Sequence, residues 1–328
     1  MKIHLISTGG TIVSVPGEHG LAPAENGGIA GWLKSSFPCH EFSFNALMNL
    51  DSSNIGPEQW RGIAAAAWGA LGDNGGVIIA HGTDTMAYTS SALGFMLRGL
   101  KKPVTLTGSQ IPFGNPLSDA PSNLALAVAA VENAVSGVTI SFGDIVINGV
   151  RAVKTSTSAM RAFESSGAPT MATLTASGLG VASRAACAPD APASLENNIC
   201  ADVFLLKLVP GANPEIFGAL RGMGFKGVVV EAFGAGNVPF AGRDISDAVR
   251  RAVAEGMAVV TRSQCLRGKV DMSAYETGMR LLDAGAISAG DMTTEAAVVK
   301  LMWALGQTRD TREIGRMFRT DFAGEITI

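Results

Sequence analysis

The chain has 328 residues, of which 47% are hydrophobic and 16% charged, and its net charge is −3. This length and apolar content predict two domains with sizeable cores. The weak negative charge and the lack of a strongly basic stretch argue against nucleic acid as a partner. No apolar run has the length of a membrane span, and the sequence begins directly with a strand pattern, so we expect no membrane association and a cytoplasmic location.

The four cysteines, at positions 39, 187, 200 and 265, show neither close pairing nor the spacing of zinc ligands. We interpret them as buried or incidental thiols. No metal ion and no organic cofactor is therefore expected.

The first apolar strand, residues 3–6, is followed by a turn with the sequence STGGTI at 7–12. The two glycines allow a tight turn or a nest of backbone N–H groups that can hold an oxyanion or a carboxylate. The turn is neither a Walker loop nor a dinucleotide-binding loop, because the required lysine and glycine spacings are missing. A polar, glycine-rich stretch, 18–28, comes next, and it is expected to be a loop, either a lid or a surface connector.

A cluster with the sequence DSSN at 51–54 precedes a helix that is predicted to start at Pro57 and to run to about Leu71. Clusters of this composition usually cap helices or form turns. A capping role is therefore the plain interpretation of these residues.

A second hydroxyl-rich turn, HGTDTM at 81–86, lies between a buried strand, 77–80, and a predicted helix, 87–98. In an open parallel sheet, ligands bind at this edge of the strands, where helix N-termini offer free N–H groups. Taken alone, Thr83 or Asp84 is better explained as a helix cap. The presence of two turns of the same construction favours a functional site.

Strands alternate with helices through the rest of the chain, which predicts right-handed βαβ units and a parallel sheet. The fold class is α/β, with a parallel-sheet N-terminal domain and a smaller α/β C-terminal domain. The predicted domains are 1–185 and 203–328, joined by a linker at 186–202. The elements expected after the second turn are strands 104–107, 138–142, 203–209, 227–231 and 257–261 and helices 118–134, 244–255, 294–306 and 311–318.

The two turns, TGGTI at 8–12 and HGTDTM at 81–86, resemble in this order the two signature motifs of the bacterial L-asparaginase family, in its cytosolic type. The resemblance continues through DSS at 51–53, TGSQ at 107–110, Lys154 and GAGN at 234–237, and so covers nearly the whole chain. It implies the hydrolysis of L-asparagine to L-aspartate and ammonia. A homodimer or homotetramer is also implied.

No serine–histidine–acid set is evident, and His81, the histidine nearest the site, is interpreted as structural. The resemblance assigns the covalent acyl intermediate to Thr11, and a second triad that positions or activates water to Thr83, Asp84 and Lys154. It also implies six residues that contact substrate: Gly10, Asp51, Ser52, Ser53, Gly82 and Asn237. From the residues alone, Lys154 is either solvated or placed near Asp84, where it activates a hydroxyl.

The sequence departs from the family pattern at two positions. A lid tyrosine that assists the first threonine is replaced by Leu21, which cannot relay a proton; we therefore expect Thr83 and Lys154 to carry more of the chemistry. An arginine expected at the family's regulatory site is replaced by Glu231, although Cys265 matches, so binding of an effector carboxylate there is disfavoured.

Three alternatives stay open at this point. A carboxamide-binding module without turnover would keep Ser52 and Asp84. A homologue that prefers glutamine is not distinguished by any residue. A subunit of a transfer-RNA amidotransferase shares the motifs, but it normally carries a further domain ahead of the first strand, which this sequence does not show.

Overall fold

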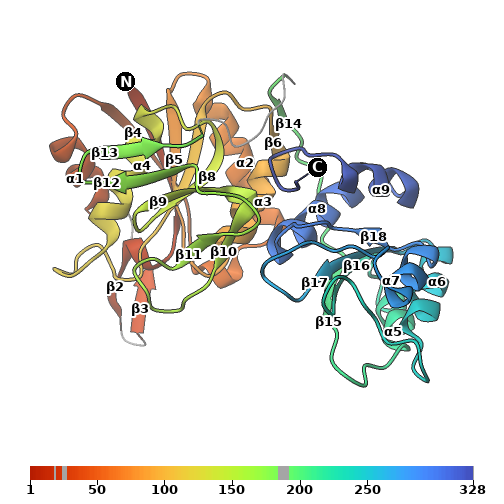
Figure 1. Cartoon of the computed structure of the whole chain (residues 1–328). Helices are drawn as coiled ribbons and strands as arrows, with labels where there is room; N and C mark the ends of the chain where they lie inside the picture. The colour runs from red at the N-terminus through yellow and green to blue at the C-terminus, as the bar shows by residue number, and fades with distance from the viewer. Residues whose placement is uncertain (18–19, 24–27, 184–191, 328) are drawn as a thin grey trace. The chain divides into compact units, whose positions relative to one another are not determined.

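The computed structural model describes residues 1–17, 20–23, 28–183 and 192–327, with the backbone alone for 15–17 and 20–23. The chain divides into two compact units (Figure 1). The first unit comprises Met1–Asn197 together with Phe322–Gly324, and the second comprises Asn198–Asp321 with Glu325–Ile328.

An eight-stranded sheet forms the centre of the first unit, with the strand order β13-β12-β9-β8-β7-β5-β1-β4. Neighbours from β4 to β8 are parallel, whereas the pairs β8–β9, β9–β12 and β12–β13 are antiparallel. The strands are β1 (Lys2–Gly9), β4 (Glu41–Leu50), β5 (Gly76–Ala80), β7 (Pro103–Thr107), β8 (Gly137–Phe142), β9 (Ile145–Asn148), β12 (Ala172–Thr175) and β13 (Gly178–Val181).

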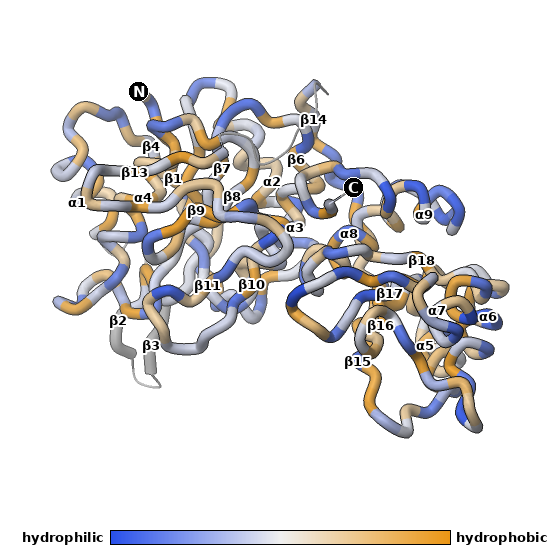
Figure 2. The backbone as a smooth tube through the Cα atoms, viewed as in Figure 1, coloured by the Kyte–Doolittle hydropathy of each residue, from blue (hydrophilic) through white to orange (hydrophobic). Residues whose placement is uncertain are grey.

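Strands β5 and β7 are buried at every position, as expected for strands covered on both faces. Helices α1 (Ile29–Ser36) and α4 (Ala120–Glu132) share one core cluster with alternate residues of β1 and β5. Helices α2 (Pro57–Leu71) and α3 (Met86–Met96) contact the sheet through β5 and β8. Figure 2 shows hydrophobic residues gathered along these strands.

The order of the strands predicts a crevice between β1 and β5. The chain leaves β1 for β4 on one side of it, and leaves β5 for β7 on the other side. In open α/β sheets, ligands bind beyond the carboxyl ends of strands at such a point, where successive connections run in opposite directions. The predicted turns at Thr11 and Thr83 follow β1 and β5, so the topology brings them to this crevice.

The loop predicted at 18–28 is in part a hairpin. Strands β2 (Ser14–Gly17) and β3 (Gly20–Pro23) pair antiparallel, and Leu21 faces Pro16 in the register. The prediction missed this pairing because neither short strand carries a strong apolar pattern. Residues 18–19 and 24–27 of the predicted loop lie outside the described residues.

The helix predicted at 87–98 ends two residues early. Leu97–Arg98 forms strand β6, which pairs antiparallel with β14 (Ser194–Leu195). This pairing joins positions almost a hundred residues apart, so local sequence could not reveal it. Strand β14 lies within the predicted linker 186–202, whose residues up to 191 are not described.

The second unit contains a four-stranded parallel sheet in the order β15-β16-β17-β18. The strands are β15 (Val203–Lys207), β16 (Gly227–Ala232), β17 (Ala258–Ser263) and β18 (Ile287–Ser288). The helices are α5 (Ile216–Gly222), α6 (Ile245–Ala254), α7 (Glu276–Asp283), α8 (Thr294–Gln307) and α9 (Thr311–Arg319). The predicted fold class, α/β with a large mostly parallel sheet and a smaller second domain, is confirmed.

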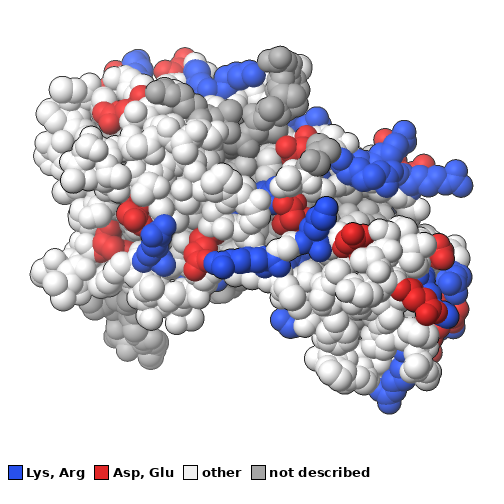
Figure 3. Space-filling view, in the orientation of Figure 1, with Lys and Arg blue, Asp and Glu red and all other residues white. Residues whose placement is uncertain are grey.

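Charged side chains are unevenly distributed over the face drawn in Figure 3. They are sparse over the first unit and gather over α9, which carries Arg312, Arg316 and Arg319. Among the described residues, no helix is both long and apolar enough to cross a membrane.

Candidate active site

The first turn begins where β1 ends. Gly10 has a φ of 81°, a left-handed conformation that favours glycine. Its N–H donates to the Leu50 carbonyl (3.1 Å), and its own carbonyl accepts from the Ser14 hydroxyl (2.9 Å). Thr11 follows as the first residue of a short 3-10 helix, Thr11–Val13, and is half-buried. The turn thus holds the Thr11 backbone at the end of a central strand.

Three turns meet at the crevice through close backbone contact. A Cβ placed on Gly10 would overlap the Cα atom of Gly82. A Cβ placed on Gly82 would lie 2.7 Å from both Cβ and Oγ of Ser52. Since a side chain at either glycine would push the turns apart, both positions require glycine. The contact brings Thr11, Thr83 and Ser52 together from three segments of the chain.

The turn at 51–53 is held from two sides. The Asp51 carboxylate accepts hydrogen bonds from the hydroxyl (2.6 Å) and the N–H (2.8 Å) of Ser53, and these bonds lower the pKa of Asp51. The Thr85 hydroxyl donates to the Ser52 carbonyl (2.6 Å). Ser52 is only 3% exposed, whereas Asp51 and Ser53 are exposed. Asp51 therefore caps the short 3-10 helix Ser52–Asn54 and not α2, which has Gly56 as its N-cap, while its carboxylate stays ionised and open to solvent.

Lys154 reaches the second turn from β10 (Ala152–Lys154), which pairs with β11 (Phe163–Ser165). Its ammonium donates to the Thr83 hydroxyl (2.9 Å) and to the Asp84 carboxylate (2.5 Å). The Lys154 side chain is 18% exposed and that of Asp84 is 65% exposed. Of the two interpretations of Lys154, the one that placed it beside Asp84 matches this geometry.

His81 is fully buried behind the turn. Its Nδ1 lies 2.6 Å from the Gly82 carbonyl, which can only accept, so Nδ1 carries the proton. Its Nε2 lies 2.9 Å from the Thr89 hydroxyl, which in turn accepts from Trp60 Nε1 at 3.0 Å. Burial lowers the pKa of His81 to about 4. A neutral histidine thus fixes the orientation of the Gly82 carbonyl, in keeping with a structural role.

The loop after β7 is held by side chains that the sequence did not single out. The Asp119 carboxylate accepts from the N–H groups of Gln110 (3.0 Å) and Ile111 (3.0 Å). The Asn123 amide donates to the Gly108 carbonyl (2.9 Å). These bonds fix TGSQ at 107–110 beside His81. The motif was noticed from the sequence, but its supporting helix α4 offers no local signal of this role.

Asn237 lies in the second unit, and its side-chain oxygen accepts from the Thr277 hydroxyl (2.5 Å). The structure therefore groups the other nine predicted site residues in the first unit and Asn237 in a different one.

Glu231, which stands where the family pattern has an arginine, is buried at the end of β16. It accepts from the Thr294 hydroxyl (2.5 Å) and lies 3.7 Å from both Arg262 and Lys207. Cys265 is exposed. Because the Glu231 carboxylate is already paired with two cations, it is a structural group of this sheet edge.

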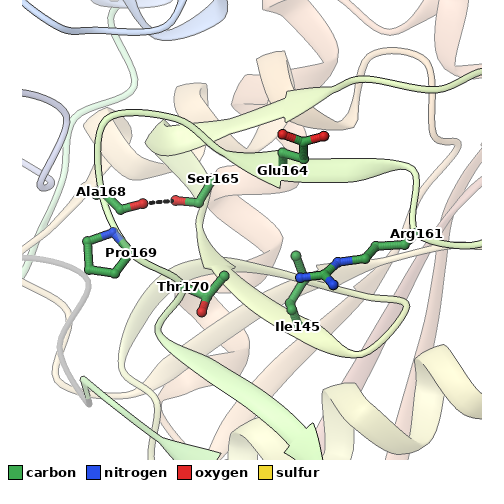
Figure 4. A pocket seen from close by; sticks show the side chains of 7 residues that line it. All are labelled: Ile145, Arg161, Glu164, Ser165, Ala168, Pro169 and Thr170. Carbon is green, nitrogen blue, oxygen red and sulfur yellow. Dashed lines mark hydrogen bonds between the residues drawn. The ribbon is translucent and has the colours of Figure 1, made fainter. Parts of the chain in front are cut away.

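A pocket of about 490 Å³ lies near β9 and β11 (Figure 4). Both of its charged side chains have polar partners, since Arg161 pairs with Asp144 (3.3 Å) and Glu164 accepts from the Thr155 hydroxyl (3.3 Å). The seven lining residues include none of the predicted site residues: Ile145, Arg161, Glu164, Ser165, Ala168, Pro169 and Thr170. Within the described part of the chain, no group of three or more His, Cys, Asp or Glu side chains could hold a metal ion.

The arrangement is suited to nucleophilic chemistry on a small polar substrate. Thr11 and Thr83 each follow one of the two glycines that are in close contact, and Thr83 is hydrogen-bonded to an ammonium group. Such a cation stabilises negative charge on a nearby oxygen and can exchange a proton with it.

Comparisons with known proteins agree with this geometry. The family model for the N-terminal domain of asparaginase matches residues 2–186, and that for the C-terminal domain of glutaminase and asparaginase matches residues 202–318. An L-asparaginase from Thermococcus kodakarensis is 38% identical over 331 residues, covering 100% of this chain and 99% of that protein. A glutamyl-tRNA(Gln) amidotransferase subunit from the same organism is also 38% identical, over 99% of this chain and 76% of that protein.

Solved structures show the same similarity. The thermostable L-asparaginase from Thermococcus kodakarensis superposes with a TM-score of 0.93 at 38% identity, over 100% of this chain and 99% of that one. L-asparaginase I from Vibrio cholerae gives a TM-score of 0.89 at 30% identity, with the same coverage. With matching domains at both ends and full-length relatives, the chain belongs to the asparaginase family of amidohydrolases.

Proposed function

We propose that the protein hydrolyses L-asparagine to L-aspartate and ammonia, with Thr11 as the nucleophile. The observation that carries this proposal is the Lys154 ammonium, which bonds both Thr83 and Asp84 next to the contact between Gly10 and Gly82. The full-length similarity to an L-asparaginase supports the choice of substrate.

In the first step, the Thr11 hydroxyl oxygen attacks the side-chain carbonyl carbon of asparagine. The hydroxyl proton passes to the amide nitrogen, the carbon–nitrogen bond breaks, and ammonia leaves. The product is an ester between Thr11 and the aspartyl group. Because a neutral amide is a poor electrophile, this step needs a group that stabilises the oxyanion.

In the second step, water attacks the ester, and aspartate leaves as the Thr11 hydroxyl regains its proton. Lys154 donates to the Thr83 hydroxyl oxygen, so the Thr83 hydrogen points away from Lys154 and can be offered to a water or a substrate oxygen. Asp84 holds the ammonium in this position from its other side. Thr83, Lys154 and Asp84 thus orient the water, and the proton that the water loses passes to the leaving Thr11 oxygen.

The α-amino and α-carboxylate groups of the substrate are assigned to the turn at 51–53. The exposed Asp51 carboxylate attracts an ammonium group, and a serine hydroxyl such as that of Ser52 can donate to a carboxylate, whereas that of Ser53 donates to Asp51. Gly10 and Gly82 permit close approach of the backbone to the bound molecule. Asn237 stays a proposed contact that a neighbouring subunit would contribute, in a homodimer or homotetramer.

A second candidate is an amidase that prefers glutamine or delivers ammonia within a larger complex. The observation that favours it is the equal identity, 38%, to a subunit of a glutamyl-tRNA(Gln) amidotransferase. A cytoplasmic location is proposed as well, because a similar structure from Campylobacter jejuni is named a probable cytoplasmic L-asparaginase.

Steady-state ammonia release from asparagine, glutamine and D-asparagine tests both candidates. We expect the highest kcat/KM with L-asparagine, and activity that a chelator leaves unchanged. Thr11→Ala and Thr83→Ala should each lower kcat by several orders of magnitude, and the double variant should be little worse than either. No ammonia from asparagine at millimolar concentration would overturn the proposal, and a higher kcat/KM with glutamine would select the second candidate.

A further inference from the structure

The position of Lys154 depends on the short helix η3 (Gly149–Arg151), which leads directly into β10. Lys154 is the third residue after η3, so a displacement of this helix would carry the lysine with it. The ammonium has to stay within hydrogen-bonding distance of both Thr83 and Asp84. What holds η3 in place therefore contributes to the geometry of these three residues, together with the pairing of β10 with β11.

On one side, η3 is fixed to α3, the helix that starts directly after the turn carrying Thr83. The Ser90 hydroxyl of α3 donates to the Gly149 carbonyl (2.7 Å). A Cβ placed on Gly149 would lie 2.9 Å from Ser90 Cβ, so the two elements are in close contact. This contact places the short helix that leads into the strand of Lys154 against the helix that follows Thr83.

From another side, η3 is held by a segment more than 170 positions away in the sequence, Phe322–Gly324. The Asn148 side chain caps η3, accepting from the Val150 N–H (3.2 Å), and donates to the Ala323 carbonyl (2.8 Å). Arg151 Nε donates to the Gly324 carbonyl (2.6 Å). Asn148 and Arg151 are 8% and 2% exposed. Two buried polar side chains thus donate hydrogen bonds to these carbonyls.

The same segment also contacts the far end of α3 and the strand after it. The ring of Phe322 lies 4.6 Å from the Arg98 guanidinium. Gly94 has no side chain, and a Cβ placed there would be 3.6 Å from Ala323 Cβ. The three residues therefore touch both the helix that follows Thr83 and Asp84 and the helix that precedes Lys154.

We propose that Phe322–Gly324 is a strap that positions Lys154 against Thr83 and Asp84, with Asn148 and Arg151 as its positioning residues. The strap acts through its main-chain carbonyls, so the conformation of its backbone matters more for the position of Lys154 than the identity of its side chains. The inference rests on the proposed function only in its expected effect on turnover. Its effect on the environment of Lys154 is independent of any activity.

Pulse acylation with acetic anhydride, read by mass spectrometry, measures the reactivity of Lys154 in the folded protein. Lys102 serves as an internal reference, because its ammonium donates to the carbonyls of Leu71 and Asn74 in another part of the unit. Arg151→Lys keeps the positive charge but loses the planar donor group that bonds Gly324. Arg262→Lys is a matched control, because Arg262 is 5% exposed and its Nε likewise donates to a main-chain carbonyl, that of Met292 (3.3 Å).

We expect Arg151→Lys to raise the ratio of Lys154 to Lys102 labelling about three- to tenfold, the factor that one lost hydrogen bond represents. It should also lower kcat about 10- to 100-fold with KM within about twofold, since misplaced catalytic groups affect turnover most. Arg262→Lys should leave the labelling ratio at the wild-type value.

An unchanged ratio in Arg151→Lys, with a loss of melting temperature equal to that of Arg262→Lys, would overturn the proposal and leave a purely structural strap. Should Arg151→Lys fail to fold, Asn148→Ala removes the bond to Ala323 and has to show the same rise in ratio. A wild-type protein that releases no ammonia would contradict the proposed function, whereas the labelling ratio would still decide the role of the strap.

Discussion

The two units each contain a lysine paired with a carboxylate, and the pairs differ in their access to solvent. In the first unit, Lys154 and Asp84 have side chains that are 18% and 65% exposed. In the second, Lys300 and Glu325 are both 0% exposed. Lys300 also donates to the Thr320 carbonyl (2.8 Å), and its ammonium lies 5.4 Å from the ring of Phe318.

The difference in solvent exposure distinguishes an ion pair that can contact another molecule from an ion pair that is fully buried. The Lys154 ammonium is shared with the Thr83 hydroxyl, and Asp84 faces solvent, so a substrate can reach both partners. Burial lowers the pKa of Lys300, although Glu325 opposes this shift. A sealed pair offers nothing to a ligand, but losing one partner leaves the other charge buried without compensation.

Removal of Lys154 is expected to have the largest effect on function. Lys154→Met should lower kcat by about 1,000-fold or more, because Thr83 loses its cationic partner. The melting temperature should change little, because partly exposed ion pairs contribute only about 0–1 kcal/mol to stability. Lys102→Met is the control for loss of a lysine elsewhere in the unit. Near-normal turnover in Lys154→Met would remove the lysine from the mechanism.

The opposite result is expected for Lys300. Lys300→Met should lower the free energy of unfolding by about 3–5 kcal/mol, because Glu325 is left buried without its partner. The kcat of the folded fraction should stay near the wild-type value. The double variant Lys300→Met/Glu325→Gln should recover part of the loss, and denaturant titration measures all three proteins. Equal stability of the single and double variants would show that the pair is not coupled.

His81 extends the comparison to a buried group that has no opposite charge beside it. Its pKa in the folded protein, about 4, is below the ordinary value of 6.5, because burial disfavours the charged form. The unfolded chain therefore binds more protons between these values, and stability should fall as the pH drops from 6.5 to 4. Over this pH range, the free energy of unfolding should decrease by about 3 kcal/mol in total.

The measurement is the difference in unfolding free energy between the wild type and His81→Gln across this pH range. Taking the difference removes the contribution of groups that both proteins share. A difference that stays constant between pH 7 and pH 4 would contradict a neutral, buried His81.

Ser52 is expected to give the smallest effect and to act on binding. Loss of a hydrogen bond to a charged group costs about 1.5–3 kcal/mol, so Ser52→Ala should raise KM, and the Kd for aspartate, by about tenfold or more. The change in kcat should be smaller. Ser35→Ala, an exposed serine that bonds the Trp32 carbonyl, is the matched control. Aspartate binding that Ser52→Ala leaves unchanged would remove Ser52 from the substrate site.

Much of the α/β alternation was predictable because it depends on local pattern. Helix α2 begins and ends at the predicted residues, and β5, β7 and β8 lie within one residue of their predicted positions. Proline at a helix start and continuous apolar runs act within a few residues of themselves. The antiparallel strands β9, β12 and β13 were missed, since they are short and their stabilising pairs lie on other segments.

The sequence by itself determined the candidate catalytic groups: the hydroxyls of Thr11 and Thr83, the Asp84 carboxylate and the Lys154 ammonium stand out by type and motif. Only the tertiary structure decided how they meet. Lys154 lies 70 positions after Asp84, and their 2.5 Å bond follows from the packing of η3 on α3. The close contact between Gly10 and Gly82 is likewise long-range, because steric fit depends on neighbours in space. The same holds for the buried hydrogen bonds that Asn148 and Arg151 donate to the carbonyls of Ala323 and Gly324.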